Sequence, residues 1–515
     1  MVWVTYVESF LVICYRITLG RYNMELLQSI LKTWRRNLFQ TLIVDDFRSW
    51  RGIDLQVASW HVQKKLISMD DSEHVGVMLP TSGLFPVAAT AIWSLGKTIV
   101  PINYLLSPDE ISYIMKDAGL KTVITVGPML NMVGPLPENV QALEMDTMSF
   151  GGLPPIRRIV KRGEETLAAL LYTSGTSGRP KGVMLSEGNI RSNVDQCCAW
   201  SGFNKSDSFL GLLPQFHSFG FTVTTMLPMS IGAKAIYSAR FNPRKTFDLL
   251  RKHRPTAMLA IPSMFNALLN AKSGEPDDFS SVRFAVSGGE ALPDAVFEGM
   301  KQKFGLVINE GYGLTETAPV TNWCRPDEHR RGSVGMPVTG VTERIVDEKG
   351  NDLGPCEDGE VRMSGPNIMQ GYYKLPEETA AVFDDQGYFR SGDMGQFDED
   401  GFLYITGRIK EMLIIGGENV FPREIEEVLT KHESVSAAGV VGRPDLSRGE
   451  VAVAFVELVD GAEFNEQALR SWCRETLASF KVPKSIILLD ELPRNPTGKI
   501  MRRALSAVLK EELSE

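Results

Sequence analysis

Apolar runs of strand length alternate with helix-length periodic segments along most of this chain, from His74 onward. The run at 74–79 is followed by a helical pattern over 82–95 and by a second apolar run at 98–102. The same alternation returns over 243–287. Repeated β-α-β order predicts parallel sheets covered by helices, with ligands at the carboxyl ends of the strands. The predicted fold class is therefore α/β, with doubly wound sheets.

Cap and turn residues define several of these elements more closely. Ser107 followed by Pro108 and Glu110 is typical of a capped helix start, so we predict a helix over 107–117. Further helices are predicted at 243–253 and 263–270, and further strands at 121–126, 256–261 and 282–287. The Gly- and Pro-rich stretch 135–161 predicts a connecting loop.

The pattern changes twice in the second half of the chain. Between about 330 and 404, short strands with frequent Gly, Asp and Pro turns predict a small β-subdomain. From Arg408 an α+β pattern begins, with a helix at 422–431, strands at 435–441 and 451–458, a helix near 466–478 and a basic C-terminal helix. We predict a large N-terminal domain of two doubly wound sheets plus the β-subdomain over 25–407, and a small C-terminal domain over 408–515.

Charge and cysteine content narrow the class of partner. The formal net charge of −9 argues against nucleic-acid binding, because that binding requires a basic footprint, and it favours a small-molecule substrate. The six cysteines show neither paired metal-ligand spacing nor the disulfide framework of a small secreted domain, which indicates a cytoplasmic protein. The six histidines are also scattered, so no zinc site is predicted.

The N-terminal segment 1–24 is the one compositional oddity. Residues 2–20 are apolar apart from Glu8, Arg16 and a few hydroxyls. Such charges are unfavourable in a bilayer span, and neither a basic start nor a small-residue cleavage site indicates a signal peptide. Three interpretations stay open: a core strand or helix, a segment that binds a membrane surface or a partner, or sequence upstream of a true start at Met24.

An apolar run at 167–172 leads into a loop rich in hydroxyls and glycines. The loop consists of Thr173, Ser174, Gly175, Thr176, Ser177 and Gly178, and Lys181 closes it. Backbone N–H groups and hydroxyls of such a loop can converge on one anion, to which the lysine adds a charge, so we predict a phosphate site. The spacing is not the Walker pattern. Composition alone would favour a flexible linker.

Two glycine-rich segments each follow a predicted strand, at 285–292 and 310–317. Their glycines let a flat ligand approach the backbone. In the second segment, Tyr312 offers a face for stacking and Glu316 offers hard oxygen ligands of the type that Mg²⁺ takes. Taken singly, two tight turns with an exposed aromatic are the alternative.

Single side chains elsewhere suit a nucleotide or an acid. Asp393 can accept hydrogen bonds from a ribose diol, to which Arg408 can donate, although Asp393 is otherwise an ordinary turn residue. Lys499 follows a Pro-Thr-Gly turn that would deliver its ammonium to a defined place, with a solvated lysine as the alternative. His217 lies among aromatics, where a purely structural histidine is equally common.

Six of these motifs, in the same order over 75–505, resemble the adenylate-forming superfamily of acyl-CoA synthetases, luciferases and peptide-synthetase adenylation domains. The resemblance implies that ATP binds in the N-terminal domain and that the C-terminal domain is mobile. The nucleotide-binding residues that it implies are Thr173, Ser174, Gly175, Thr176, Ser177, Gly178, Lys181, Gly288, Gly289, Glu290, Glu310, Gly311, Tyr312, Gly313, Thr315, Glu316, Asp393, Arg408 and Lys499.

The resemblance also implies separate roles within this set. Lys499, Thr173 and Glu316 are the expected catalytic residues, and Thr173 and Glu316 the expected Mg²⁺ contacts. The expected contacts with the acid substrate are His217, Gly288 and Gly313. Lys410 is the expected hinge, and Gly416 and Gly417 match the loop that meets the pantetheine arm of CoA.

The details favour a fatty acid as substrate. Glu310, where many relatives have Gln, and the tail Ala318-Pro319-Val320 are similar to long-chain fatty acyl members. We expect a fatty acid–CoA ligase that forms an acyl-adenylate, with residues 219–229 lining an acyl tunnel or, alternatively, only core. Acyl carrier protein as the acceptor, another carboxylic acid as the substrate, contact with a membrane surface, and a non-catalytic lipid or nucleotide sensor stay open.

Overall fold

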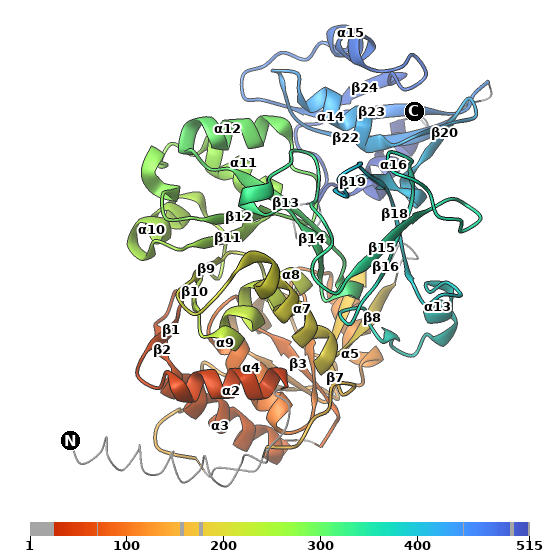
Figure 1. Cartoon of the computed structure of the whole chain (residues 1–515). Coiled ribbons are helices and arrows are strands. Elements are labelled where there is room, and N and C mark those ends of the chain that lie inside the picture. Colours follow the sequence, from red (N-terminus) through yellow and green to blue (C-terminus); the bar gives the residue numbers. More distant parts are fainter. Residues whose placement is uncertain are drawn as a thin grey trace.

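The computed structural model describes residues 25–69, 71–154, 159–174, 179–445, 447–494 and 499–512. The N-terminal segment 1–24 and the loop residues Gly175, Thr176, Ser177 and Gly178 lie outside these residues. Two large sheets with their helices form the lower body of the molecule, and a smaller sheet connects it to the C-terminal domain (Figure 1). The predicted α/β class, with a large N-terminal and a small C-terminal part, is confirmed.

A seven-stranded sheet forms the first layer. In spatial order its strands are β17 (Gly371–Tyr372), β8 (Pro180–Ser186), β7 (Leu167–Ser174), β4 (Thr98–Pro101), β3 (His74–Met78), β5 (Thr122–Thr125) and β6 (Gln141–Glu144). The strands from β7 to β6 run parallel, whereas β8 is antiparallel to both of its neighbours. Its helices are α3 (Gly52–Met69), α4 (Leu84–Ser94), α5 (Pro108–Asp117) and α6 (Gly127–Val133).

An eight-stranded sheet forms the second layer. Its order is β14 (Val320–Trp323), β13 (Ile308–Gly313), β12 (Phe284–Ser287), β11 (Ala257–Ala260), β9 (Ser208–Gly211), β10 (Lys234–Tyr237), β1 (Thr41–Val44) and β2 (Ser49–Arg51). Only the outermost strand at each edge is antiparallel to its neighbour. Its longer helices are α2 (Leu26–Arg36), α7 (Glu187–Ser201), α10 (Pro243–His253), α11 (Pro262–Asn270) and α12 (Asp294–Phe304).

Helix α4 joins the cores of the two sheets. All of its residues from Phe85 to Ser94 are buried, as expected for a helix that is apolar on every side. The Trp93 indole N–H donates to the Ala168 carbonyl of β7 (2.9 Å). The Phe221 ring meets Phe85 and Trp93 edge-on, at centroid distances of 6.0 and 6.3 Å. The two sheets therefore share one apolar core, which holds the ends of their strands in a fixed relation.

Phe221 belongs to a helical stretch with a π-helical centre. This stretch consists of α8 (Ser218–Phe221), the π-helix η1 (Thr222–Met226) and α9 (Leu227–Ile231). Val223, Met226 and Met229 are at most 1% exposed and lie in the shared core. Of the residues 219–229 predicted to line an acyl tunnel or to be only core, Phe219 lines the cavity described below and residues 220–229 do not.

The β-subdomain is an antiparallel sheet in the order β15 (Thr342–Val346), β16 (Gly359–Ser364), β18 (Phe389–Phe397) and β19 (Leu403–Arg408). It carries α13 (Pro376–Ala381), and the short helices of the N-terminal part are η2 (Pro276–Phe279), η3 (Thr315–Thr317) and η4 (Pro326–Glu328). Strand β19 ends at Arg408, and η5 (Ile409–Glu411) leads into the C-terminal domain.

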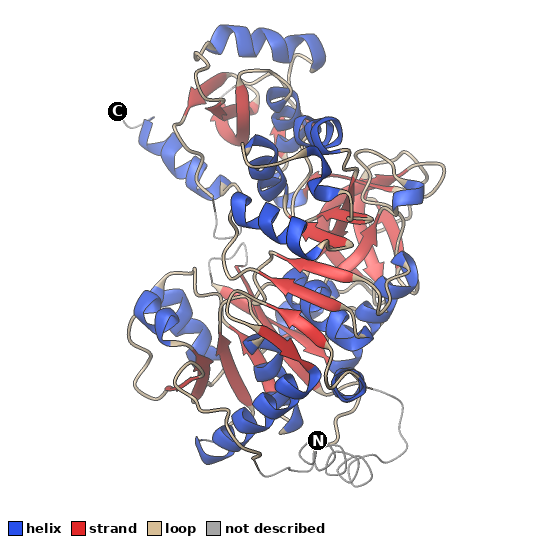
Figure 2. Cartoon of the chain, turned by 90° about the vertical axis from the view of Figure 1, so that its left-hand side faces the viewer, coloured by secondary structure: helices blue, strands red, loops and turns tan. Residues whose placement is uncertain are grey.

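The C-terminal domain has its own apolar core. Its elements are β20 (Leu413–Ile415), β21 (Glu418–Val420), α14 (Pro422–Thr430), β22 (Val435–Asp445), β23 (Gly449–Leu458), α15 (Glu466–Thr476), β24 (Ser485–Leu488) and α16 (Arg502–Glu512). Figure 2 shows this domain stacked at one end of the larger body.

Two features of the fold differ from the sequence-based prediction. The stretch 135–161, predicted as a loop, contains β6 at the edge of the first sheet, where a strand of sequence Gln-Ala-Leu-Glu has too little apolar character to be detected. Strand β24 was not predicted. By contrast α5 begins after Ser107 as predicted for a capped helix start, and the cap is a capping box in which Ser107 and Glu110 satisfy each other's backbone N–H.

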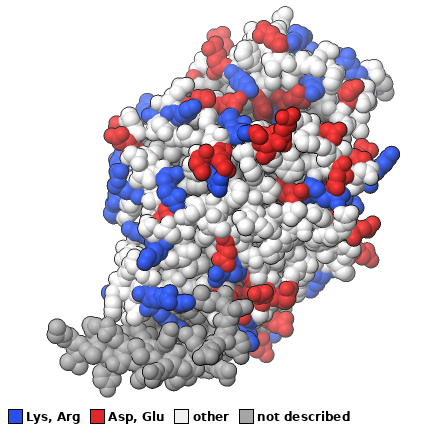
Figure 3. Space-filling view, in the orientation of Figure 1, with Lys and Arg blue, Asp and Glu red and all other residues white. Residues whose placement is uncertain are grey.

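Surface charge is mixed in the described part of the chain. On the face shown in Figure 3, acidic and basic side chains are interspersed, so opposite charges neutralise one another locally. Within the described residues, no helix is long and apolar enough to cross a bilayer.

Candidate active site

A cavity of about 950 Å³ lies where strands β12 and β13 end, against the β-subdomain and the C-terminal domain. This is the carboxyl edge of the second sheet, where parallel folds bind their ligands. The structure brings the following predicted residues to its wall: Thr173, Lys181, His217, Gly288, Gly289, Glu290, Gly311, Tyr312, Gly313, Thr315, Glu316, Arg408, Lys410 and Lys499. Residues from six separate segments of the sequence, between Thr173 and Lys499, therefore meet in one space.

Tyr312, Asp393 and Arg408 form a hydrogen-bonded group at this cavity. The Tyr312 hydroxyl donates to Asp393 Oδ2 (2.6 Å), and Arg408 Nε lies 2.8 Å from Asp393 Oδ1. Asp393 is 3% exposed, and burial raises the pKa of its carboxyl although the Arg408 charge opposes this rise. Strands β18 and β19 set the spacing, because Asp393 and Arg408 are paired across them. A ribose diol would have to take over at least one of these contacts.

Glu316 and Thr173 supply oxygen atoms to the same cavity. Oε1 of Glu316 accepts a hydrogen bond from the Tyr372 hydroxyl (2.9 Å), and burial raises the pKa of the Glu316 carboxyl. Carboxylate and hydroxyl oxygens are the donors that Mg²⁺ prefers, and they leave room for phosphate oxygens as further ligands. No group of three or more His, Cys, Asp or Glu among the described residues could hold a metal. The oxygen donors of Glu316 and Thr173 fit a Mg²⁺ ion whose other ligands are phosphate oxygens.

Lys181 stands beside Thr173, its pairing partner across β7 and β8. Its ammonium forms an ion pair with Glu378 of α13 and lies 5.1 Å from the centroid of the Tyr372 ring. Ser174 is the last residue of β7. The described ends of the phosphate loop therefore face the cavity.

Lys499 is the only one of the predicted catalytic residues that comes from the C-terminal domain. Burial lowers the pKa of its ammonium, with the Glu290 carboxylate acting in the opposite direction. Burial likewise raises the pKa of Glu290, an effect that the Lys499 charge reduces. The Lys499 ammonium and the Glu290 carboxylate of the N-terminal domain therefore lie at the same cavity.

The part of the cavity near His217 is mainly apolar. His217 caps α8, accepting a hydrogen bond at Nδ1 from the Phe219 N–H (3.4 Å), and burial lowers its pKa. An imidazole that accepts a hydrogen bond at Nδ1 carries a proton on Nε2. The Phe219 ring covers Gly288, where a Cβ would come within 3.1 Å of Phe219 Cε1. The wall continues with Leu213, Pro214, Phe241, Ile261 and Met264.

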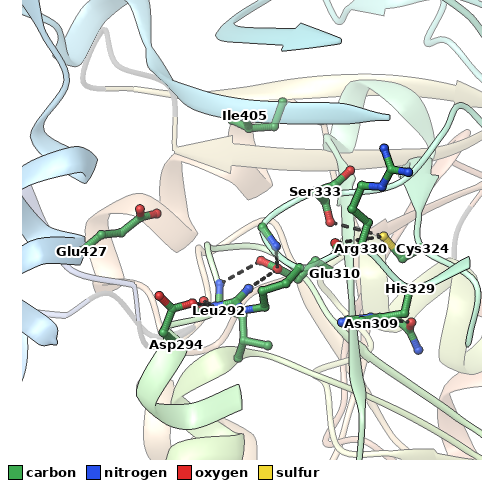
Figure 4. A network of polar contacts seen from close by, with 12 residues as sticks. Leu292, Asp294, Asn309, Glu310, Cys324, His329, Arg330, Ser333, Ile405 and Glu427 are labelled. Carbon is green, nitrogen blue, oxygen red and sulfur yellow. Dashed lines mark hydrogen bonds and ion pairs between the residues drawn. The ribbon is translucent and has the colours of Figure 1, made fainter. Parts of the chain in front are cut away.

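Glu310 does not line the cavity. Its carboxylate accepts from the backbone N–H groups of Leu292 (3.3 Å) and Gly332 (3.1 Å) and pairs with Arg331 (Figure 4). Arg331 Nη2 also lies 2.6 Å from Asp294 Oδ1. The Glu310 carboxylate therefore holds the segment around Arg331, and contact of Glu310 with the nucleotide stays a prediction.

Asp294 makes a second ion pair, with the C-terminal domain. Its Oδ2 lies 2.9 Å from Lys431 Nζ at the end of α14. Both side chains are about half exposed. The domain that carries Lys499 is thus tied to the first residue of α12 by one accessible contact.

Gly416 and Gly417 form the turn between β20 and β21, with φ of 65° and 89°. Positive φ at both positions is the geometry of a tight hairpin turn that favours glycine. No atom lies within 4 Å of a Cβ built on either residue, and neither lines the cavity. The structure places this turn away from the other predicted site residues.

Several cavity residues had no detectable sequence signal. Tyr372 lies on the two-residue strand β17, and Glu378 lies on a short exposed helix. Phe241, Ile261 and Met264 looked like ordinary core positions. Their position at the site depends on tertiary packing.

Two family models match this chain. The model of the AMP-binding enzyme matches residues 64–373, and that of the AMP-binding enzyme C-terminal domain matches 424–499. The chain belongs to the AMP-binding enzyme family. The gap between the two matches, residues 374–423, contains Arg408, where strand β19 ends.

Curated relatives of this AMP-binding enzyme include ligases for different acids. A long-chain-fatty-acid–CoA ligase of Bacillus subtilis (strain 168) is 34% identical over 85% of this chain and 86% of the relative. A sulfoacetate–CoA ligase of Cupriavidus necator is 32% identical over 85% of this chain and 88% of the relative. The reaction type is thus shared among relatives whose acids differ.

Solved structures resemble this AMP-binding enzyme over almost its whole length. ATP-bound MatB from Rhodopseudomonas palustris has a TM-score of 0.86 at 28% identity, over 95% of this chain and 99% of that chain. The apo form of MatB, with the same coverage, has a TM-score of 0.76 at 29% identity. The arrangement described above therefore lies closer to the ATP-bound form.

Proposed function

We propose that this protein is an AMP-forming ligase that activates a long-chain fatty acid as its acyl-adenylate and transfers the acyl group to CoA. The general reaction, ligation of an acid to CoA with ATP, follows from family membership and from the named activities of the relatives. The observation that carries the proposal is that Lys499, Arg408 and Glu316, from distant parts of the chain, line one cavity.

The proposed first step joins the acid to AMP. A carboxylate oxygen of the acid attacks the α-phosphorus of ATP, the bond to the bridging oxygen breaks, and pyrophosphate leaves with the electron pair. Positioning and charge stabilisation dominate such a step. Lys499 would stabilise charge on the attacking carboxylate and the α-phosphate, and Lys181 with the loop 173–178 would hold the β- and γ-phosphates. Mg²⁺, held by Glu316 and Thr173, would supply charge that stabilises the leaving pyrophosphate.

The remaining predicted site residues would orient the adenylate. Gly288, Gly289 and Glu290 would border the adenine, Tyr312 would stack on it, and Asp393 with Arg408 would bind the ribose. Gly289, with φ of 87°, is a position where a side chain would be strained.

In the proposed second step the C-terminal domain rotates about Lys410. Lys499 would leave the cavity, and the turn Gly416–Gly417 would approach it. The thiol sulfur then attacks the acyl carbon, AMP leaves, and the thiol proton passes to solvent. A single cavity would thus serve two reactions in turn.

Two observations support a fatty acid as the substrate. The relative from Bacillus subtilis is a long-chain-fatty-acid–CoA ligase, and the described wall near His217 consists of apolar or neutral side chains. The acyl chain of the substrate would run along Phe219, Ile261 and Met264 toward Phe241, because these residues line the cavity and residues 220–229 do not. Such a wall favours an aliphatic chain over an acid with a second charge.

The sulfoacetate–CoA ligase of Cupriavidus necator is the reason for keeping another carboxylic acid as the second candidate. Acyl carrier protein remains an alternative acceptor, a membrane surface an alternative partner, and a non-catalytic sensor the remaining alternative class. Measuring pyrophosphate release with CoA and then with carrier protein as the acceptor would show which of the two the enzyme uses.

The specificity constant kcat/KM should rise with the length of the acid. Each methylene that is buried contributes about 0.8 kcal/mol, or roughly fourfold, until the chain fills the cavity. The measurement compares acids from acetate to palmitate, with coumarate as the aromatic acid and sulfoacetate as the charged one. A maximum at acetate, coumarate or sulfoacetate would contradict the fatty-acid assignment and leave the adenylation chemistry standing.

A further inference from the structure

Tyr372 touches two cavity residues to which the proposed function gives separate roles. Its hydroxyl donates to Glu316 Oε1 (2.9 Å), and the Lys181 ammonium lies 5.1 Å from the centroid of its ring. The residue itself is 8% exposed and lines the cavity. One side chain therefore contacts both the expected metal ligand and the expected phosphate ligand.

The backbone around Tyr372 is held firmly. Strand β17 pairs with β8, and this places Tyr372 opposite Val183, two residues from Lys181. The Tyr372 N–H donates to Thr379 Oγ1 (2.9 Å), and that hydroxyl donates to the Leu375 carbonyl (2.8 Å). Helix α13 thus fixes the strand from the other side, so the direction of the phenol ring is set before any ligand binds.

We propose that Tyr372 is a positioning residue for ATP and its metal, an inference that rests on the roles proposed for Glu316 and Lys181. The hydroxyl holds one oxygen of the Glu316 carboxylate, which fixes the direction in which the other oxygen points. A carboxylate with one oxygen held loses less rotamer entropy when it binds a cation. Tyr372 acts through Glu316 and needs no contact with the reacting atoms.

The ring has a second effect, on Lys181. A lysine ammonium is a point charge on a flexible stem, and its present carboxylate partner, Glu378, is 43% exposed. Phosphate groups of ATP would replace Glu378 as that partner. The aromatic face of Tyr372 attracts the cation in both situations and keeps it near the cavity.

The two contacts predict different results for two substitutions. Tyr372→Phe keeps the ring and removes the hydroxyl, so it should raise by about tenfold the Mg²⁺ concentration that gives half-maximal ATP–pyrophosphate exchange. It should weaken the binding of Mn²⁺ with ATP, measured by electron paramagnetic resonance without the acid, by a similar factor. Binding of ATP in EDTA should not change. Tyr372→Leu removes both contacts and should weaken that metal-free binding as well.

Controls separate positioning from loss of structure. Tyr373→Phe makes the same change at the neighbouring residue, which does not line the cavity, and should leave every value at that of the unmodified protein. Glu316→Gln should weaken Mn²⁺–ATP binding, and adding Tyr372→Phe to it should weaken that binding little further, because the two side chains act as one unit.

Unchanged metal requirement and unchanged Mn²⁺–ATP binding in Tyr372→Phe would overturn the inference. The inference would also be overturned if Tyr372→Phe weakened metal-free ATP binding, raised the KM for the acid and lowered the melting temperature. Such a result would indicate a purely structural role. Absence of exchange in the unmodified protein with every acid tested would contradict the proposed function instead, and Mn²⁺–ATP binding would still test Tyr372.

Discussion

Lys499→Ala should lower acid-dependent ATP–pyrophosphate exchange by about 30- to 1,000-fold. This corresponds to roughly 2–4 kcal/mol for the loss of one preorganised charge that stabilises the transition state. The ammonium belongs to a partly buried side chain that lines the cavity, with the Glu290 carboxylate near enough to affect its pKa, so solvent would replace it only in part. Conversion of supplied acyl-AMP to acyl-CoA should continue at close to the original rate, because Lys499 is assigned to the first step only.

A matched control uses a lysine that is exposed. Lys510→Ala changes the same side chain on α16, away from the cavity, and both half-reactions should remain as they were. Equal losses in the two half-reactions of folded Lys499→Ala would contradict the division of labour that we propose.

Lys410→Pro should separate the half-reactions in a different way. Lys410 is the second residue of η5, where the fixed φ of proline and the missing N–H are tolerated. The arrangement seen here should therefore survive, whereas a rotation that needs another φ at this residue would be hindered. We expect exchange to be retained and thioester formation from supplied acyl-AMP to fall by about tenfold or more.

Lys410→Ala is the companion variant, because it removes the charge and keeps the backbone free to rotate. Both of its half-reactions should stay within a few-fold of the original rates. If Lys410→Pro leaves thioester formation unchanged, the hinge assignment is wrong. If exchange falls and thioester formation does not, proline has excluded the present arrangement instead.

Local signals in the sequence predicted individual elements well. Helix α5 begins where Ser107 and Glu110 form a capping box, and α10 covers the predicted 243–253, with the Asn242 side chain capping it. These ends are determined within a few residues of chain. Strand β6 depends on its partner β5 for hydrogen bonds, and nothing in its own residues required it to be a strand.

The residues of the site were predicted unevenly for the same reason. Motifs with glycines or charges, such as those of Gly289 and Lys499, are recognisable without a structure. Tyr372 is not, because its importance arises from contacts with Glu316, 56 positions earlier in the chain. Glu310 shows the opposite case: it lies within a recognised motif, but its carboxylate pairs with Arg331 and the residue does not line the cavity.

The ion pair between Asp294 and Lys431 is one of the contacts that hold the C-terminal domain against the larger body, beside the hydrogen bond that Arg423 donates to the Ile405 carbonyl. When Lys431 leaves, Asp294 keeps Arg331 as a partner, and the Lys431 ammonium, already 52% exposed, gains water. An accessible pair of this kind contributes about 1 kcal/mol or less. This contact therefore favours the arrangement seen here only weakly. Added salt, which screens the ion pair, should shift the population toward separated domains. Under the proposed rotation about Lys410, each catalytic cycle needs both arrangements, and a shallow preference between them allows faster turnover.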